Sequence, residues 1–410
     1  MRVTSARIAA LLSVLVVLSA CSERTPGPTG ITASRTGLPF ASGLASPTWQ
    51  AMAANRAIGL TPPVGSLNPL QATHAYALVG VAQYLAVQQA DAAAGSDGRS
   101  QFEAERGAVA GASAVVLTYL FPGGAPAYEA LVMEQSSAGP GQPNPWFARG
   151  EAIGREVGAA IVTRAQGDGY SRVVNPAPPI GPGYWTTNAP GLAVAGGQFP
   201  GITPWFLTSA SQFRPDPPPA FGSATFNAAL AEIRNLSDNR TAEQRRIAAA
   251  WAYNTGTITP PGFWLQVATD GINAHGLSER ETTHLYALLS ATMLDAAIGC
   301  WDAKLTYWLV RPWIADPGIV VVIPEVGKPN HPSYPSGHSC VSASAAEVIS
   351  TFFPDERAQL DAMVIEAGLS RMYGGIHYGF DITAGQDLGR NVARFTIAAD
   401  ASGNSLLTPH

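Results

Sequence analysis

The chain has few charged residues and few cysteines for its length of 410 residues. Lysine and arginine together number 24, and no run of them is dense enough to indicate a nucleic-acid-binding surface. The three cysteines show none of the paired spacings that hold a structural zinc ion. After residue 21 no hydrophobic stretch is both long enough and free enough of charge to cross a membrane, which argues against an integral-membrane protein.

The first 21 residues have the pattern of an export signal. Arg2 and Arg7 flank the start of an apolar run, residues 8–18, that is shorter than a membrane span. The run ends in Leu-Ser-Ala-Cys21, which resembles the site where bacterial lipoproteins are cleaved and lipidated; an ordinary signal peptide with an incidental cysteine is the alternative. Residues 22–45, rich in Ser, Thr, Pro and Gly, are expected to be a flexible tether. The sequence thus predicts a protein exported to the bacterial cell envelope, with lipid on Cys21 as its only membrane attachment.

Helical periodicity dominates the rest of the chain, and few stretches alternate as strands do. We therefore expect one all-α domain over residues 46–410, packed as helical bundles. Helices are expected at about 69–94, 101–121, 124–136, 146–167, 224–235, 260–273, 279–298, 300–311, 338–353, 355–369 and 377–397. Thr241 and Gln244 form a capping-box pattern that opens one more helix. Residues 168–221, rich in Gly, Pro, Trp and Phe, are expected to be a long loop whose aromatic side chains either pack or contact substrate.

Chemically informative residues cluster between residues 301 and 381. Lys304 and Arg311 are seven residues apart, which predicts that both leave one face of a helix that Pro312 terminates. Pro-Ser-Gly-His, residues 335–338, stands where the next helix begins, and the free amides and dipole of a first helical turn favour an anion. Each of these features alone is also typical of a solvated helix face or a tight turn.

A third cluster adds proton-transfer groups. Ser370 and Arg371 are followed by His377, and Asp381 lies four residues further on. A carboxylate at that spacing can hold one imidazole nitrogen and leave the other free and basic. A lone histidine of this kind is more often simply packed. The three clusters in this order, however, predict a site that holds a tetrahedral oxyanion and moves protons around it.

The pattern K-x6-R-P, P-S-G-H and S-R-x5-H-x3-D resembles that of the superfamily joining type 2 phosphatidic acid phosphatases, bacterial acid phosphatases and vanadium-dependent haloperoxidases. Every motif position is present. The resemblance implies a helical-bundle fold and a set of residues that bind the oxyanion: Lys304, Arg311, Ser336, Gly337 and Arg371. It also implies that His377 is the ligand of vanadium or the phosphohistidine nucleophile, with His338 as the acid–base partner and Asp381 behind His377.

Several features favour the haloperoxidase branch. The motifs begin only at residue 304, after a long helical half, and Trp301 and the residues around it resemble the haloperoxidases. His331, seven residues before His338, resembles the bromoperoxidase pattern, or it simply caps a turn. This branch implies a vanadate cofactor, with hydrogen peroxide, halide and an organic acceptor as substrates. The alternative is an exported phosphomonoesterase that uses a phosphohistidine and no vanadate.

Two other kinds of protein are less consistent with the sequence. A zinc hydrolase built on His331, His338 and His377 would place a bare cation beside three permanent positive charges. A non-catalytic oxyanion-binding lipoprotein would leave His338 and Asp381 unexplained. One further question stays open at this point. If Lys304 and His338 share an anion, Cys300 and Cys340 lie on neighbouring helices, either as a disulfide or as two buried thiols.

Overall fold

In the computed structural model, the residues described are 43–59, 65–93, 98–136, 144–322, 325–403 and 407. The predicted export signal lies outside these ranges, as does most of the predicted tether. Within them the chain is helical without any β-strand, apart from an isolated bridge between Tyr184 and Leu309. The all-α prediction is confirmed. None of the helices in the described part of the chain is both long and apolar enough to span a membrane.

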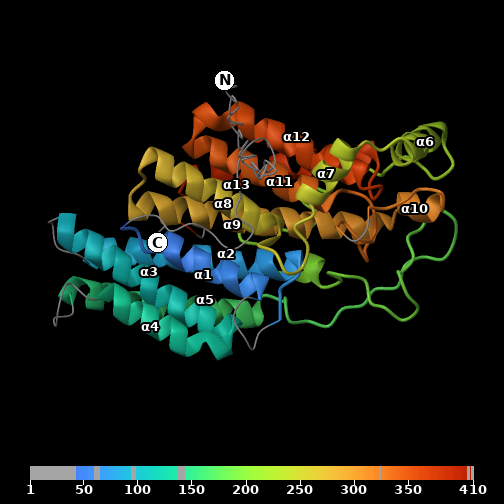
Figure 1. The fold of residues 1–410 in the computed structure, drawn as a ribbon. Helices are drawn as coiled ribbons and strands as arrows, with labels where there is room; N and C mark the ends of the chain where they lie inside the picture. The colour runs from blue at the N-terminus through green and yellow to red at the C-terminus, as the bar shows by residue number, and fades with distance from the viewer. Residues whose placement is uncertain are drawn as a thin grey trace, which may run out of the picture.

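The helices are arranged in layers (Figure 1). Helices α3, α4 and α5 form one outer layer, α2 and α9 lie side by side in the middle, and α11 packs against α9, α12 and α13. The bounds are α1 (Ser46–Ile58), α2 (Pro69–Ala93), α3 (Gly98–Leu120), α4 (Ala125–Ser136), α5 (Pro145–Gly167), α6 (Ala224–Asp238), α7 (Ala242–Ala250), α8 (Thr259–His275), α9 (Glu279–Tyr307), α10 (Pro312–Ala315), α11 (Gly337–Phe352), α12 (Arg357–Tyr373) and α13 (Gly379–Ala401).

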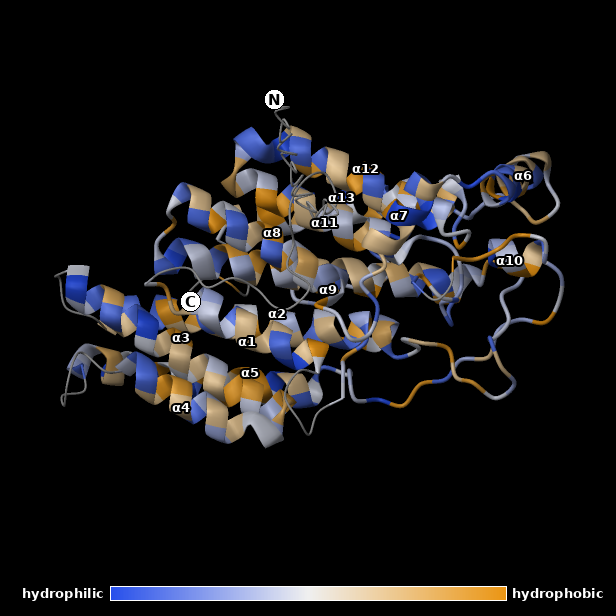
Figure 2. Ribbon diagram, viewed as in Figure 1, coloured by the Kyte–Doolittle hydropathy of each residue, from blue (hydrophilic) through white to orange (hydrophobic). Residues whose placement is uncertain are grey.

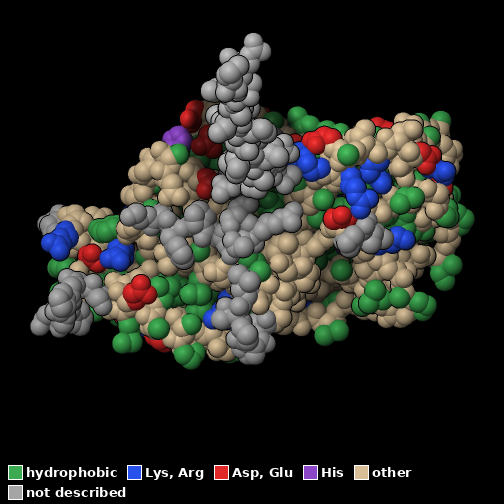
Figure 3. Space-filling model, in the orientation of Figure 1, with side chains coloured by type: hydrophobic (Ala, Val, Ile, Leu, Met, Phe, Trp, Pro, Cys, Tyr) green, Lys and Arg blue, Asp and Glu red, His purple; other side chains and the backbone are tan. Residues whose placement is uncertain are grey.

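Hydropathy follows this layering. Helices α2 and α9 are buried along most of their length, whereas hydrophilic residues gather on α6 and α7 at the margin (Figure 2). On the face shown in Figure 3, basic side chains near α7 alternate with acidic ones. Arg245 pairs with Glu325 at 3.2 Å and Arg246 with Glu243 at 2.7 Å.

Two glycines of α13 let this helix approach the start of α11. A Cβ atom added at Gly389 would lie 2.3 Å from the carbonyl oxygen of Cys340, and one at Gly385 would lie 2.7 Å from that of Ser336. Both distances are shorter than van der Waals contact, so only glycine allows these two backbones to pack so closely. This contact holds the first turn of α11 against the helix that carries Asp381.

The segment between α5 and α6 is irregular, as predicted. Its aromatic side chains mostly pack: Trp185 and Phe199 are fully buried. The carboxylate of Asp295 on α9 fixes one part of the segment by accepting hydrogen bonds from the backbone amides of Trp205 and Phe206, both at 2.8 Å.

The prediction of two helices at 279–298 and 300–311 is wrong. Residues Glu279–Tyr307 form one continuous helix, because packing on both sides outweighs the weak helix preference of Gly299. The helix then ends earlier than predicted. Trp308 adopts a left-handed conformation with φ 52°, and Arg311 is extended, as expected before a proline. Lys304 and Arg311 therefore do not share a helix face.

A candidate oxyanion site

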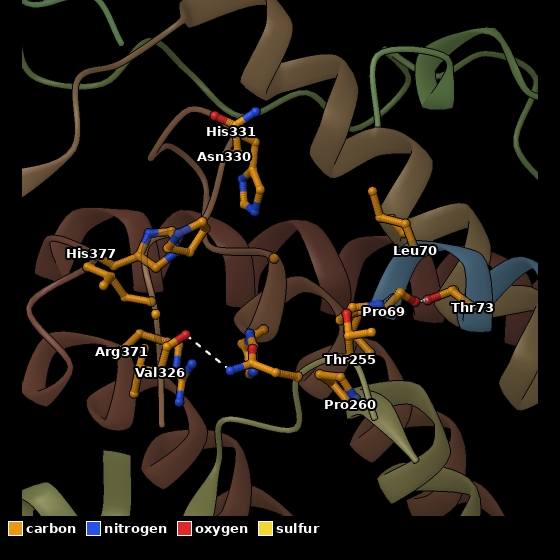
Figure 4. A pocket seen from close by; sticks show the side chains of 18 of the residues that line it. Pro69, Leu70, Thr73, Thr255, Pro260, Val326, Asn330, His331, Arg371 and His377 are labelled. Carbon is orange, nitrogen blue, oxygen red and sulfur yellow. Dashed lines mark hydrogen bonds between the residues drawn. The ribbon is translucent and has the colours of Figure 1, made fainter. Parts of the chain in front are cut away.

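A cavity of about 400 Å³ lies between the start of α2, the start of α8, α9, α11 and the loop that precedes α11. Four polar side chains converge on one part of it: His331, His338, Arg371 and His377. In Figure 4, His331, Arg371 and His377 face the interior of this cavity from three separate segments. All four residues were predicted from the sequence. The helix predicted at 355–369 ended too early, because α12 continues to Tyr373 and includes Arg371.

Arg371 is a buried cation with an unused donor. Its side chain is 2% exposed and lies in the last turn of α12. Nε donates to the hydroxyl of Ser370 at 3.0 Å and Nη2 donates to the carbonyl of Ala248 at 3.0 Å, while Nη1 has no hydrogen-bond partner within the described residues. Burial and the nearby Arg311 lower the pKa of Arg371 to about 9, so the group is charged at neutral pH. A buried cation with a free donor on a cavity is suited to bind an anion.

His377 is held in one tautomer. Nδ1 donates to Oδ2 of Asp381 at 2.8 Å, and Nε2 lies 3.0 Å from Nη1 of Arg311. Because a guanidinium can only donate, Nε2 of His377 carries the lone pair. Burial, followed by the charge of Arg311, lowers the pKa of His377 well below its ordinary value. The imidazole is therefore neutral, and a ligand that bonds to Nε2 would replace its hydrogen bond with Arg311.

Asp381 is buried behind His377, at the start of α13. Its Oδ2 also accepts hydrogen bonds from the hydroxyl of Ser333 at 2.6 Å and from the amide of Tyr378 at 3.1 Å. Burial raises the pKa of Asp381 to about 6, so the carboxylate is charged at neutral pH. It thereby fixes both the orientation and the tautomer of His377.

Arg311 connects two histidines of the site. Nε donates to the carbonyl of His331 at 3.0 Å, and Nη2 lies 3.1 Å from Nδ1 of the same residue. Nδ1 of His331 must therefore accept, which leaves its Nε2 protonated. Burial lowers the pKa of His331 well below its ordinary value and that of Arg311 to about 9. The ring of His331 also packs against Trp301, with the centroids 5.0 Å apart.

Lys304, unlike Arg371, has all its donors engaged by the protein. Its ammonium group donates to the backbone carbonyls of Pro332 and Ser333, both at 2.9 Å, and to that of Pro335. All three donors are thus used within the loop before α11, and the side chain does not line the cavity. Burial lowers its pKa to about 8. Trp301, one helical turn earlier, places its ring 5.6 Å from this ammonium group.

The first turn of α11 lies beside the cavity. Ser336 is its N-cap, and the hydroxyl accepts a hydrogen bond from the amide of Ser339 at 3.4 Å. Gly337 lines the cavity, and a Cβ atom there would lie 3.3 Å from the ring of Trp301. The earliest amides of a helix have no partner inside the helix, so this turn supplies donors to a nearby anion.

His338 is fixed by a residue that the sequence did not point to. Its Nε2 lies 3.0 Å from the carbonyl oxygen of Trp251, just after α7. The carbonyl can only accept, so Nε2 is protonated and Nδ1 carries the lone pair. Burial and the charge of Arg371 lower the pKa of His338 well below its ordinary value. The C-terminal end of α7 therefore orients both His338 and, through Ala248, Arg371.

Cys300 and Cys340 are both free thiols in the structure. They are buried and close enough for one thiol to hydrogen-bond to the other. The expectation that they lie on neighbouring helices is confirmed, because they belong to α9 and α11, which pack together. Of the two states left open by the sequence, the structure has the reduced one.

The residues fit a tetrahedral oxyanion such as phosphate or vanadate. Arg371, Gly337 at the N-terminus of α11 and the neutral His377 line one end of the cavity, and the buried Arg311 contacts His377 without lining the cavity itself. The charges of Arg311 and Arg371 exceed that of Asp381, so an anion is favoured there over a bare cation.

The part of the chain that carries the motifs matches a known family. Residues 282–401, which contain all three motifs, match the PAP2 superfamily. The predicted superfamily is confirmed. No match was found among curated proteins.

Solved structures show the same fold over most of the chain. A bacterial vanadium-dependent iodoperoxidase is similar with a TM-score of 0.71 and 24% identity, over 88% of this chain and 97% of that one. A bacterial vanadium-dependent chloroperoxidase in its holo form is similar with a TM-score of 0.64 and 15% identity, over 82% of this chain and 93% of that one. The helical-bundle fold is therefore that of the vanadium haloperoxidases.

Proposed function

We propose that the protein is a vanadium-dependent haloperoxidase, which uses hydrogen peroxide to oxidise halide to hypohalous acid. The overall reaction joins one peroxide, one halide ion and one proton to give one hypohalous acid and one water. The observation that carries the proposal is the neutral His377, whose Nε2 lies 3.0 Å from the buried Arg311 and whose ring lines the same cavity as the buried Arg371. Such a nitrogen can bond to vanadium, while the guanidinium groups bind the oxygens of vanadate.

Each residue has a defined task in this proposal. When bound, vanadate supplies the Lewis acidity that activates peroxide toward halide. Asp381 keeps the lone pair of His377 on Nε2, and Arg371 donates to an oxygen of the anion through Nη1. His338, with its lone pair on Nδ1, accepts a proton from peroxide and returns a proton to the product. His331 presents an N–H group to the same cavity and can donate to a bound anion.

The runner-up function is phosphomonoester hydrolysis. The same arrangement suits a phosphoryl transition state, with Nε2 of His377 as nucleophile and His338 as the acid that protonates the leaving group. The match of residues 282–401 to the PAP2 superfamily is the reason to retain this reaction as the alternative. No feature of the cavity described above favours it over halide oxidation.

One pair of assays separates the two functions. The purified protein is loaded with vanadate and tested for halogenation of a diketone with peroxide and iodide, bromide or chloride. The vanadate-free protein is tested for hydrolysis of an aryl phosphate. Vanadate-dependent halogenation supports the proposal, whereas hydrolysis that vanadate inhibits, without halogenation, supports the alternative.

We also propose that the protein acts outside the cytoplasm, held at the cell envelope by lipid on Cys21. The support is the order of the first 21 residues, with arginines, a short apolar run and Leu-Ser-Ala-Cys. Metabolic labelling with a tagged fatty acid tests it. The label is expected in the wild-type protein and absent from Cys21→Ser; equal labelling of both would refute the anchor.

A further inference from the structure

The cavity extends well beyond the groups that would bind an oxyanion. Its volume of about 400 Å³ is in the range that encloses small organic ligands, whereas a tetrahedral oxyanion has only five heavy atoms. In Figure 4, Pro69, Leu70 and Pro260 lie across the cavity from His377 and Arg371. We call the part lined by Pro69, Leu70, Pro260 and Pro261 the apolar half. The cavity therefore has a charged end and a separate apolar half.

Thr73 and Asn254, two polar side chains beyond the charged end, have their donors already engaged. The hydroxyl of Thr73 donates to the carbonyl of Pro69 at 2.7 Å. The amide of Asn254 donates to the carbonyls of Glu325 and Val326 at 2.8 and 3.2 Å. A sugar or polyol bound here would bury hydroxyl groups without matching partners, which costs about 1–3 kcal/mol for each group. An apolar ligand meets no such penalty.

We propose that the apolar half binds a small aromatic compound, and that this compound is the halogen acceptor. The inference rests on the proposed function for the identity of the reaction, but the apolar character of the ligand follows from the cavity alone. Thr255 and Lys328 also line the cavity and are exposed to solvent, so one polar substituent of the ring can remain at the opening.

Halogenation of the bound ring needs no reagent other than hypohalous acid. Hypohalous acid formed at the charged end reacts with the ring held in the apolar half. A carbon–halogen bond forms and the oxygen–halogen bond of the acid breaks. The ring carbon loses its proton, which leaves with the hydroxide as water. A ring held beside the site of formation is halogenated before the acid diffuses into solution.

Binding to the vanadate-free protein tests the apolar half without any turnover. Phenylphosphonate places an anion and a ring on one molecule, methylphosphonate lacks the ring, and inorganic phosphate has only the anion. Calorimetry is expected to give at least tenfold tighter binding of phenylphosphonate than of methylphosphonate. Equal affinities of the two phosphonates would overturn the inference, whatever the protein catalyses.

Leu70→Asn is the matched variant, because Leu70 is half-buried in the first turn of α2, where a polar residue is tolerated. It should bring the ratio of the two affinities below threefold and leave phosphate affinity unchanged. Val341→Thr, which adds a hydroxyl at constant shape on the cavity wall, should act in the same direction if Leu70→Asn does not fold. Leu192→Asn, at an exposed position outside the cavity, is the control and should keep the full ratio.

Turnover separates failure of this inference from failure of the proposed function. In the vanadate-loaded enzyme, Leu70→Asn should raise the KM of an aromatic acceptor at least fivefold without changing the KM of halide or peroxide. Halogenation that is insensitive to this variant would mean that the acceptor reacts with released acid, and would overturn the inference alone. A tenfold phenylphosphonate preference without halogenation by any halide would instead contradict the proposed function and leave the apolar ligand site standing.

Discussion

The sequence motifs predict that Lys304 and Arg371 both bind the oxyanion, but the two side chains have different surroundings in the structure. All three donors of Lys304 are used by backbone carbonyls of the loop before α11. Arg371 keeps Nη1 without a partner in the described part of the chain and lines the cavity. Replacing each by methionine should therefore give opposite results. Lys304→Met should mainly destabilise the fold, and Arg371→Met should mainly abolish anion binding.

The magnitude for Lys304 follows from two opposing contributions. Hydrogen bonds to a charged donor contribute roughly 1.5–3 kcal/mol each, and Lys304→Met removes three of them. The pKa of Lys304 is lowered to about 8, so keeping the buried group charged at neutral pH costs about 3 kcal/mol, a cost that methionine does not carry. The net loss in the free energy of unfolding is about 1.5–6 kcal/mol. Urea denaturation of both variants measures it.

Arg371→Met should unfold at nearly the wild-type urea concentration but bind phosphate about 10- to 100-fold more weakly, the effect of one lost charge-assisted hydrogen bond. Calorimetric titration with phosphate gives this ratio, and Lys328→Met is the control for loss of an exposed cation at the cavity. If Lys304→Met kept full stability while losing phosphate affinity as Arg371→Met does, the ammonium group would be an oxyanion ligand and the reasoning from its three carbonyl partners would be refuted.

Three further predictions concern the histidines and the helix contact. His377→Ala should lose vanadate binding, whereas His338→Ala should bind vanadate normally and turn over at least a hundredfold more slowly; ultrafiltration and steady-state kinetics decide this, and the reverse pattern would exchange the two roles. Because the pKa of His377 is lowered, its Nε2 stays unprotonated at pH 6.5 and gains a proton only at lower pH. Vanadate affinity should therefore be unchanged at pH 6.5 and should decrease at lower pH. A decrease centred above pH 6.5 would contradict the assignment. Sulfate, which needs no lone pair, should not weaken over the same range. Gly389→Ala should lower the free energy of unfolding by about 2 kcal/mol or more, because its Cβ would lie 2.3 Å from the carbonyl of Cys340. Gly299→Ala is the control, because a Cβ there would lie 3.5 Å from its nearest neighbour, the carbonyl oxygen of Ala210. Equal stability of the two variants would contradict the close packing of α11 and α13.

Much of the helical framework was predictable from periodicity, although α1 (Ser46–Ile58) was not predicted. The early end of α9 has a local cause. The seven-residue spacing of Lys304 and Arg311 suggests a shared helix face only if the helix continues between them. The helix ends at Tyr307, and Trp308 caps it in a left-handed conformation that a tryptophan gives no reason to expect. Pro312 did signal an end, but its effect reaches only the residue before it.

The candidate site was predictable where side chains carry the signal. His377 and Asp381 are four residues apart, and their hydrogen bond is present even though His377 precedes the helix. The contacts that orient His338 and Arg371 were not predictable, because the partners are backbone carbonyls of Trp251 and Ala248. A carbonyl has no signature in the sequence. The Thr241 capping box predicted that α7 begins, but not which residues its last turn faces.

The central claim is that His377 presents a neutral nitrogen to a bound vanadate that supports halide oxidation. The most direct test is diketone halogenation with peroxide and bromide, iodide or chloride, measured on the wild-type protein and on His377→Ala while vanadate is titrated. The account predicts halogenation by the wild-type protein that rises with vanadate and saturates, and none by the variant. No halogenation by the wild-type protein with any of the three halides, together with hydrolysis of an aryl phosphate that vanadate inhibits, would contradict it.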